Sequence, residues 1–156
     1  MVRICSLFGV FLLLGESLAA QSLGKQADRQ FGQMAYAQAV NLYEQALTNS
    51  ASLSESDRRA AKVKLGYSYY QMHDTQNAER VYRELMNEGA LGPEYTQCYL
   101  YYAQSLASNG KYRESQAMYE KYTKAQPDDK RGQAFSKLYR DVTPLTSNAD
   151  SYSWNF

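Results

Sequence analysis

The sequence is poor in the residues from which most catalytic and metal sites are built. It contains one histidine, two cysteines and one tryptophan among 156 residues. A metal centre or a nucleophilic triad needs several histidine, cysteine or carboxylate groups that converge, and no such set stands out. His73 lies where a turn is expected, and Asp128 and Asp129 precede a predicted helix, where helix capping explains them. A glycine-rich phosphate loop is also absent. We therefore expect no enzymatic activity, no cofactor and no bound metal.

An excess of charge of one sign is missing as well. The formal net charge is +1, which gives no reason to expect nucleic acid or a membrane surface as a partner. The basic residues Arg58, Arg59, Lys62 and Lys64 cluster on a predicted helix, where they are expected to form a solvated face. Cysteine is equally limiting, because only Cys98 lies beyond the first twenty residues. If the first twenty residues are removed as a signal peptide, an internal disulfide is excluded. The aromatic neighbours of Cys98 predict a buried thiol.

The first twenty residues have the pattern of a secretory signal peptide. Arg3 is followed by an apolar run of eleven residues from Ile4 to Leu14, and small residues end at Ala20. This run is shorter than the roughly 20 residues that cross a bilayer, which disfavours the alternative of an uncleaved anchor. Gln21 stands where a lipoprotein would carry cysteine. We expect export to the periplasm or cell envelope, with cleavage near Ala20 and no direct membrane insertion afterwards.

The rest of the chain has the composition and the helix-start and helix-stop signals of an all-α protein. Fifteen tyrosines stand among good helix formers, and no segment before residue 145 alternates with strand period. Ser54 and Asp57 form a capping-box pattern, Pro93 suits a first helical turn, and Gly110 suits a left-handed helix end. His73 lies in a predicted turn where histidine tolerates positive φ. These signals predict helices near residues 23–33, 36–48, 54–72, 75–87, 93–110, 112–124 and 128–141. In the first of them, Ala27, Gln30, Phe31 and Met34 are expected on one stripe.

One pattern occurs three times: a small residue, an aromatic residue four positions later and an apolar residue three further. The copies begin at Ala39, Ala78 and Ser115, and their aromatic residues recur 39 and 37 residues apart. A period of this length that contains two helical patterns predicts stacked helical hairpins. Such arrays present surfaces to partners and rarely carry out chemistry, so the pattern favours a binding module.

These residues resemble the tetratricopeptide repeat. The second copy carries the motif best, the third is close to it, and the first is weaker. The matching positions of the second copy are Leu65, Gly66, Tyr69, Ala78, Tyr82 and Leu85. Those of the third are Tyr99, Tyr102, Ala103, Leu106, Gly110, Tyr112, Ser115, Tyr119, Tyr122 and Pro127, and those of the first are Ala27, Phe31, Tyr36, Ala39, Tyr43 and Ala46. The resemblance implies a short α-solenoid of three hairpins plus a carboxy-terminal capping helix. The small residues would let paired helices approach, and the tyrosines would fill the space between hairpins.

A narrower resemblance rests on the predicted signal peptide and on the short sequence from Ala27 to Phe31. Together with the repeats, they are similar to the amino-terminal part of OmpA-like envelope proteins of Bacteroidota, some of which serve type IX secretion and gliding. We divide the chain into a signal peptide at 1–20, a repeat domain at 21–141, and a linker or tail at 142–156. In that tail Tyr152, Trp154 and Phe156 alternate with polar residues, either by chance or as the start of a missing β domain.

Two functions remain open at this point. The first is a periplasmic scaffold that binds a protein or peptide in an envelope or secretion complex. The second is a structural spacer of a larger peptidoglycan-associated OmpA-like protein with no ligand of its own. In the repeat architecture the first helix of each hairpin lines a groove, and these residues are expected to face it, beside Asp28: Phe31, Val63, Tyr67, Tyr70, Gln71, Leu100, Tyr101 and Gln104. The alternative is that these side chains pack in the core. The partner and the oligomeric state are not specified by the sequence.

Signal cleavage has a direct test. Because small residues end a short apolar run without a lipobox cysteine, the exported protein should begin at Gln21. Intact-mass spectrometry of the secreted product would show the loss of residues 1–20. A full-length or lipid-modified product would contradict the assignment.

Overall fold

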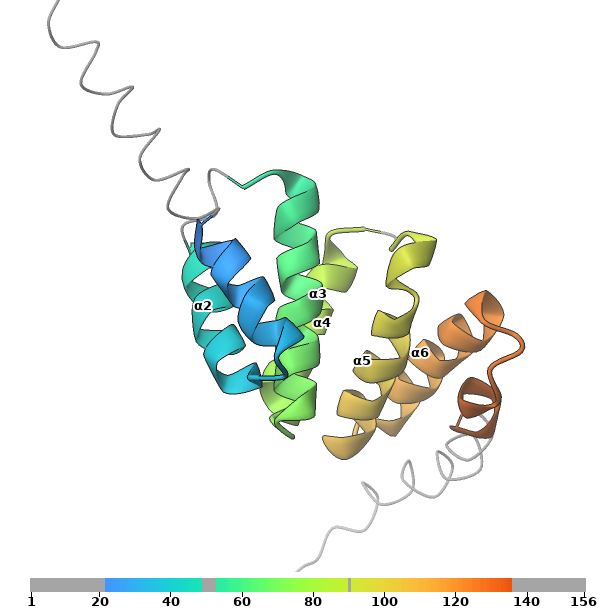
Figure 1. The fold of residues 1–156 in the computed structure, drawn as a ribbon. Helices are drawn as coiled ribbons and strands as arrows, with labels where there is room; N and C mark the ends of the chain where they lie inside the picture. Colours follow the sequence, from blue (N-terminus) through green and yellow to red (C-terminus); the bar gives the residue numbers. More distant parts are fainter. Residues whose placement is uncertain (1–21, 49–52, 90, 136–156) are drawn as a thin grey trace, which may run out of the picture. The chain divides into compact units, whose positions relative to one another are not determined.

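All regular secondary structure in the described residues is helical. The computed structural model describes residues 22–48, 53–89 and 91–135, shown in Figure 1. A helix over residues 22–32 is followed by α2 (Tyr36–Thr48), α3 (Glu55–Gln71), α4 (Thr75–Asn87), the 3-10 helix η2 (Pro93–Tyr95), α5 (Gln97–Ser108), α6 (Tyr112–Ala125) and a helix that covers residues 130–135. The predicted all-α fold of successive helical pairs is confirmed. The signal peptide, the tail and the predicted helix beyond residue 135 lie outside the described residues.

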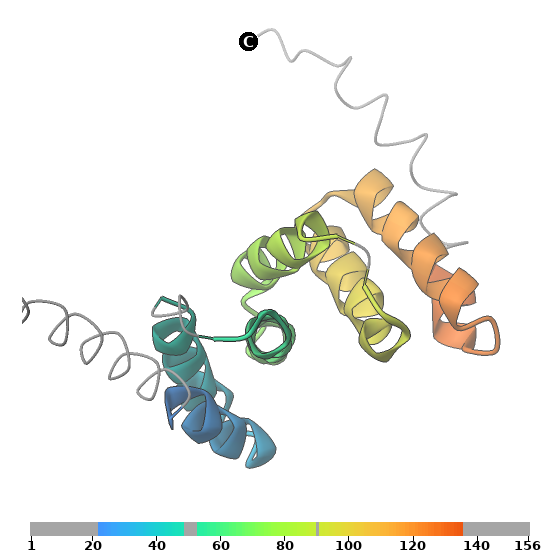
Figure 2. The same cartoon turned by 90° about the horizontal axis from the view of Figure 1, so that it is seen from above.

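The chain divides into two compact units, residues 1–74 and 75–156. We call them the amino-terminal and the carboxy-terminal unit and describe each by itself. In the amino-terminal unit, the helix over residues 22–32 and α3 both lie beside α2 (Figure 1). In the carboxy-terminal unit, α5 lies between α4 and α6. Figure 2 shows α5 and α6 side by side from above. In the part of the chain that the structure describes, no helix has the length and apolar character to cross a membrane.

Most helix ends follow the sequence signals. Ser54 caps α3, because its Oγ accepts a hydrogen bond from the backbone nitrogen of Asp57 at 3.1 Å. Asp129 serves the last helix in the same way, since its Oδ1 accepts from the backbone nitrogen of Arg131 at 2.9 Å. One expectation needs correction: Pro93 opens the short 3-10 helix η2, and α5 begins only at Gln97. Proline suits a first turn of either helix type, so its presence alone does not distinguish them.

Each helical pair is joined by a turn with one residue in the left-handed region. These residues are Met34 (φ 59°), His73 (φ 59°) and Gly110 (φ 77°). The sequence predicted this conformation for His73 and Gly110. Met34 was expected to continue the apolar stripe of the first helix, and this is wrong, because Met34 lies in the turn with 74% of its surface exposed. Methionine lacks the conformational signature that glycine carries at such positions.

In the amino-terminal unit, one carboxylate joins three helices. Asp28, on the helix over residues 22–32, accepts hydrogen bonds at Oδ1 from the Tyr43 hydroxyl of α2 at 2.6 Å and from Lys64 Nζ of α3 at 2.7 Å. Burial opposes ionisation of Asp28, but the bonds from Lys64 and Tyr43 and the Lys64 charge outweigh it and lower its pKa. Burial of the ring, together with the hydrogen bond to the same carboxylate and its charge, raises the pKa of Tyr43 far above its usual range.

In the carboxy-terminal unit, α5 and α6 share an apolar core. Leu100 and Ala103 of α5 pack with Tyr119 and Tyr122 of α6, and the Phe135 ring stacks on Tyr119 with centroids 5.4 Å apart. The last helix also approaches α6 closely at one glycine of its own. A Cβ on Gly132 would lie 2.7 Å from Thr123 Oγ1 and 2.8 Å from Tyr122 Cδ1. The helix over residues 130–135 therefore covers this face of α6, as a capping helix should.

Cys98 is a buried thiol, as its surroundings predict. It is 3% exposed on α5, and burial raises its pKa to about 12. A thiol held protonated in this way is a poor nucleophile and metal ligand.

Glu79 of α4 is a buried acid that the sequence analysis did not single out. It is 4% exposed, pairs with Arg83, and accepts from Lys111 Nζ at 2.6 Å and Asn109 Nδ2 at 2.7 Å. Asn109 also exchanges hydrogen bonds with Thr75, the first residue of α4. This network attaches α4 to the turn between α5 and α6.

Replacing Asp28 by asparagine should destabilise the protein at neutral pH and matter less in acid. A carboxylate whose folded pKa is lowered contributes stability above its unfolded pKa, near 3.9, and loses it as pH falls through the folded pKa. Because Asp28 is partly exposed to solvent, we expect a loss of about 1 kcal/mol or less at pH 7. Urea unfolding of parent and Asp28→Asn at pH 7 and pH 3 measures the difference. A difference that does not shrink at pH 3 would contradict this electrostatic account.

The Glu79 network should contribute more to the free energy of unfolding than an exposed ion pair on the same helix. Glu79→Ala leaves the Asn109 amide without its carboxylate, so we expect a loss of roughly 1–3 kcal/mol in the free energy of unfolding. Glu84→Ala is the matched control, because Glu84 pairs with Arg80 at 3.3 Å while its side chain is 48% exposed. That control should change stability by no more than about 0.5 kcal/mol. Chemical denaturation giving equal losses for the two variants would refute the assignment.

Candidate functional site

Four half-buried aromatic rings gather in the amino-terminal unit. Phe31 lies 5.9 Å from Tyr36 and 5.8 Å from Tyr67, and Tyr67 lies 6.0 Å from Tyr36 and 6.3 Å from Tyr70, measured between ring centroids. We call these four residues the aromatic cluster. The rings meet at interplanar angles from 37° to 75°, and tilted or edge-to-face contacts are favourable for aromatic pairs. The cluster is thus a packed group of rings that is still partly exposed to solvent.

Local structure explains why these rings meet. Phe31 stands near the end of the helix over residues 22–32, and Tyr36 is the first residue of α2 after the tight turn at Met34. The turn therefore brings two residues that are close in sequence to one side. Tyr67 and Tyr70 are three positions apart on α3, which places them on the same helix face.

The cluster carries a polar edge made of phenol and amide groups. Gln71 Nε2 donates a hydrogen bond to the Tyr67 hydroxyl. Burial and the neighbouring Tyr67 raise the pKa of both Tyr36 and Tyr70. The phenols of Tyr36 and Tyr70 accordingly stay protonated at neutral pH, so the cluster offers rings together with hydrogen-bonding groups. Such a surface can bind another chain, because tyrosine buries area while its hydroxyl keeps a polar contact.

The structure brings four of the expected groove residues together: Phe31, Tyr67, Tyr70 and Gln71. Val63 is half-buried on α3, one turn before Tyr67, and Tyr101 and Gln104 are half-buried on α5 in the other unit. Whether any of them binds a partner stays a prediction. The sequence analysis named Tyr36 only as a position of the repeat motif and not as a groove residue, although its place at the start of α2, close to Phe31, could have suggested it.

Leu100 needs correction as an expected groove residue. It is 1% exposed and packs with Ala103 and the two core tyrosines of α6. Leu100 and Ala103 are three positions apart and share the face that meets α6, while Tyr101 is rotated away from that face. A large apolar side chain on the core-facing side of a helix belongs to the core.

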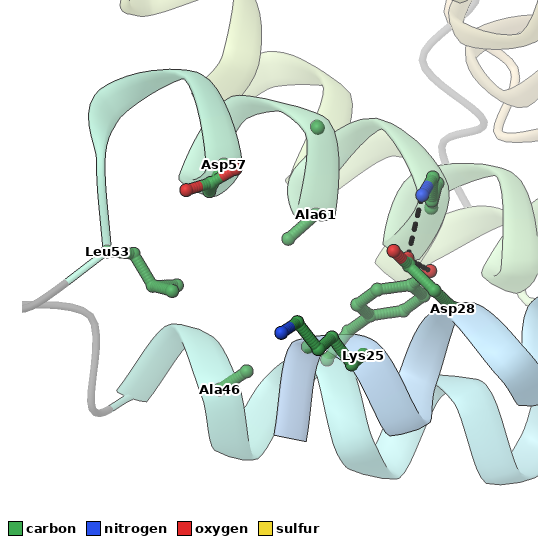
Figure 3. Close-up of a pocket in the computed structure, with 10 residues that line it drawn as sticks. Lys25, Asp28, Ala46, Leu53, Asp57 and Ala61 are labelled. Atoms are coloured by element: carbon green, nitrogen blue, oxygen red, sulfur yellow. Dashed lines mark hydrogen bonds and ion pairs between the residues drawn. The ribbon is translucent and has the colours of Figure 1, made fainter. Parts of the chain in front are cut away.

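A cavity of about 340 Å³ lies on the other side of Tyr43, whose ring is 6.4 Å from Phe31. Its walls come from the start of the first helix, the end of α2 and the start of α3. The lining residues are Gly24, Lys25, Asp28, Tyr43, Ala46, Leu53, Asp57, Ala60, Ala61 and Lys64. Figure 3 shows Lys25 reaching toward the space between Ala46 and Ala61, with the Asp28–Lys64 ion pair at one end.

The cavity combines small apolar walls with four charged groups, two of each sign. Asp28 is bonded to Tyr43 and Lys64, as described above. Asp57 accepts a hydrogen bond from Ser54 Oγ at 2.6 Å in the first turn of α3, where a carboxylate also suits the helix dipole. Across the described ranges, no three His, Cys, Asp or Glu side chains are grouped so that they could hold a metal ion.

Comparison with known proteins gives a family and a fold. A family described as "Tetratrico peptide repeat" matches residues 25–119 and 70–139. A search of curated proteins found no match. Among solved structures, a TPR-like protein from Chlorobium tepidum TLS is similar with a TM-score of 0.60 and 14% sequence identity, over 86% of this chain and 98% of that one. At this identity the structural likeness supports the fold alone.

The family match spans more than half of the sequence and covers the same residues whose small–aromatic–apolar pattern forms the helical pairs. Helical repeats of this kind act as scaffolds for protein–protein interaction. The chain therefore belongs to the tetratricopeptide-repeat family.

Proposed function

We propose that this protein is an exported scaffold that binds a protein or peptide partner through the aromatic cluster. The observation that carries the proposal is the group of four half-buried rings with an uncharged polar edge in the amino-terminal unit. Aromatic residues with a hydrogen-bonding tip are enriched among the residues that dominate binding energy at protein interfaces.

The chemistry of the cluster defines what kind of partner it fits. The phenols of Tyr36 and Tyr70 are protonated at neutral pH, because burial and the neighbouring phenol raise their pKa. The amide of Gln71, beside the cluster, donates a hydrogen bond to the Tyr67 hydroxyl. A segment with an apolar or aromatic anchor would bury area against these rings, and its backbone polar groups would meet the hydroxyl edge.

The setting of this function is part of the same proposal. A signal peptide at residues 1–20 would place the scaffold in the periplasm or cell envelope, and the similarity to OmpA-like proteins of Bacteroidota suggests an envelope or type IX secretion complex. The alternative is a structural spacer of a larger peptidoglycan-associated protein, in which the cluster would serve packing alone. The two readings differ in whether a separate protein contacts the cluster in cells.

Site-specific photo-crosslinking separates them. Tyr70 belongs to the cluster, with its ring centroid 6.3 Å from that of Tyr67, and can be replaced by p-benzoylphenylalanine in cells that export the protein. We expect a discrete crosslinked protein, identified by mass spectrometry. The same photoreactive residue in place of Tyr95, a half-buried tyrosine of η2 outside the cluster, should not give this product.

A second substitution ties the product to the cluster. Tyr67→Ala removes the ring that contacts the other three, so crosslinking from position 70 should fall at least about ten-fold if these rings are binding anchors. The Tyr67→Phe variant keeps the ring and should retain most of the product. Circular dichroism confirms that each variant is folded. The absence of a product at position 70, or an equal one at position 95, would favour the spacer.

A further inference from the structure

The alternating aromatic residues of the sequence after residue 150 have no role in the proposed function. Tyr152, Trp154 and Phe156 are separated by Ser153 and Asn155, and we call residues 152–156 the aromatic segment. In an extended backbone, residues two positions apart point to the same side. The three rings would then share one side of the segment and the polar side chains the other. Because the segment contains no charged side chain, its aromatic side can be buried without leaving a charge unpaired.

The aromatic cluster offers a surface with a matching spacing. Its four rings are half-buried, so each keeps area that another ring can cover. The Tyr67 ring lies 6.0 Å from Tyr36 and 6.3 Å from Tyr70, measured between centroids. Side chains two positions apart on an extended strand are about 6.6 Å apart, which is close to this spacing. Successive rings of the aromatic segment can therefore meet successive rings of the cluster, and such aromatic pairs are favourable.

The chain between the last described residue and the aromatic segment is long enough for contact within one molecule. Residues 136–151 lie between Phe135 and Tyr152. Sixteen residues extend to about 54 Å, or to about 43 Å if the last helix continues to residue 141, as the sequence predicts. The boundary between the units falls only four positions after Tyr70, and a compact unit of about 60 residues is roughly 27 Å across. The path from Phe135 to the cluster is therefore shorter than the chain that spans it.

We propose that the aromatic segment docks on the aromatic cluster of the same molecule, and that a separate partner binds by displacing it. This inference rests on the proposed role of the cluster as a binding surface and adds an internal competitor. A segment tethered in this way has an effective concentration in the millimolar range. A dissociation constant of about 0.1 mM then keeps it docked in roughly nine molecules of ten, and lowers the apparent affinity of a partner about ten-fold.

The first test uses the intrinsic fluorescence of Trp154, the only tryptophan of the sequence. In the purified exported protein, its emission should be blue-shifted from that of a synthetic peptide of residues 146–156. Quenching by acrylamide should be weaker than in the peptide by at least about two-fold, because most molecules hold the segment docked. Both values should be independent of protein concentration. Peptide-like quenching would overturn the proposal, and so would a dependence on concentration, since a second copy would then be the occupant.

Substitutions in the cluster and in the segment identify the two sides of the contact. Tyr67→Ala should raise the quenching of Trp154 to that of the peptide, whereas Tyr95→Ala, at a half-buried tyrosine of η2, should leave it unchanged. Circular dichroism shows whether each variant is folded. An unchanged Trp154 in a folded Tyr67→Ala variant would mean that the segment does not use the cluster.

The segment variant combines Tyr152→Ser with Phe156→Ser and alters no described residue. It should expose Trp154 as Tyr67→Ala does, because it removes two of the three rings that dock. Leu145→Ser is the matched control in the same tail and should have no effect. If the segment variant leaves the quenching of Trp154 as low as in the parent, the aromatic residues do not hold the segment and the proposal fails.

A photoreactive residue at position 70 locates the contact and separates this proposal from the scaffold function. In the purified protein, p-benzoylphenylalanine in place of Tyr70 should crosslink to residues 152–156 of the same chain, as peptide mapping by mass spectrometry would show, and in place of Tyr95 it should not. Absence of this internal crosslink would refute the docking even if a separate protein is captured in cells. An internal crosslink without any captured protein would refute the scaffold function alone.

Competition with a partner is measured in cells that export the protein. The segment variant should increase the amount of protein captured from position 70, up to about ten-fold, because the internal competitor is gone. An unchanged amount would show that the partner does not displace the segment, and would overturn this part of the proposal.

Discussion

Several tyrosines with buried rings bring their hydroxyl to a carboxylate from another part of the chain, and these bonds join the elements within each unit. Burying a hydroxyl without a hydrogen bond is costly, whereas a bond to a carboxylate is among the stronger ones in proteins. Such bonds occur at Tyr43, which donates to Asp28 at 2.6 Å, at Tyr69, which donates to Glu44 at 2.8 Å, and at Tyr122, which donates to Asp129 at 2.6 Å. Each bond is specific in position, so it fixes how one element lies along another.

Tyrosine contributes both to the core and to the surface that we propose for binding. Where the ring is fully covered, as at Tyr43 and Tyr122, the hydroxyl serves the internal register. Where it is half-covered, as at Tyr36 and Tyr67, the ring is part of the aromatic cluster that we propose as the binding face. A tyrosine-rich chain can therefore form both its core and its proposed interaction surface from one type of side chain. Tyr43 stands at the boundary, with the aromatic cluster on one side and the cavity on the other.

Helix positions could be predicted from the sequence because their signals are local. The bounds of α2 and α4 follow from turn residues, and the Ser54 cap and the left-handed His73 and Gly110 are encoded within a few positions. The conformation of Met34 could not be predicted, since methionine carries no backbone preference for positive φ. The polar contacts of Glu79 also escaped prediction, because they reach residues 30 and 32 positions away.

The candidate site was predictable in part for the same reason. Phe31, Tyr67 and Tyr70 were identified from the repeat alignment, and they meet in one cluster. The prediction that Leu100 faces the groove was wrong because an alignment assigns a helix face only approximately. An error of one position rotates a side chain about the helix axis by about 100°. The cavity had no sequence signal at all, since it arises where glycine and alanines of three helices happen to face one another.

The importance of the tyrosine–carboxylate bonds can be measured most directly by removing single hydroxyl groups. Tyr43→Phe and Tyr122→Phe each delete one oxygen and leave the ring in place, while Tyr95→Phe deletes a hydroxyl from a half-buried ring of η2. The account predicts losses of about 1.5–3 kcal/mol in the free energy of unfolding for the first two, because each ends a hydrogen bond to a charged group. It predicts a change within about 0.5 kcal/mol for Tyr95→Phe. Equal and small effects of all three in urea denaturation would contradict it.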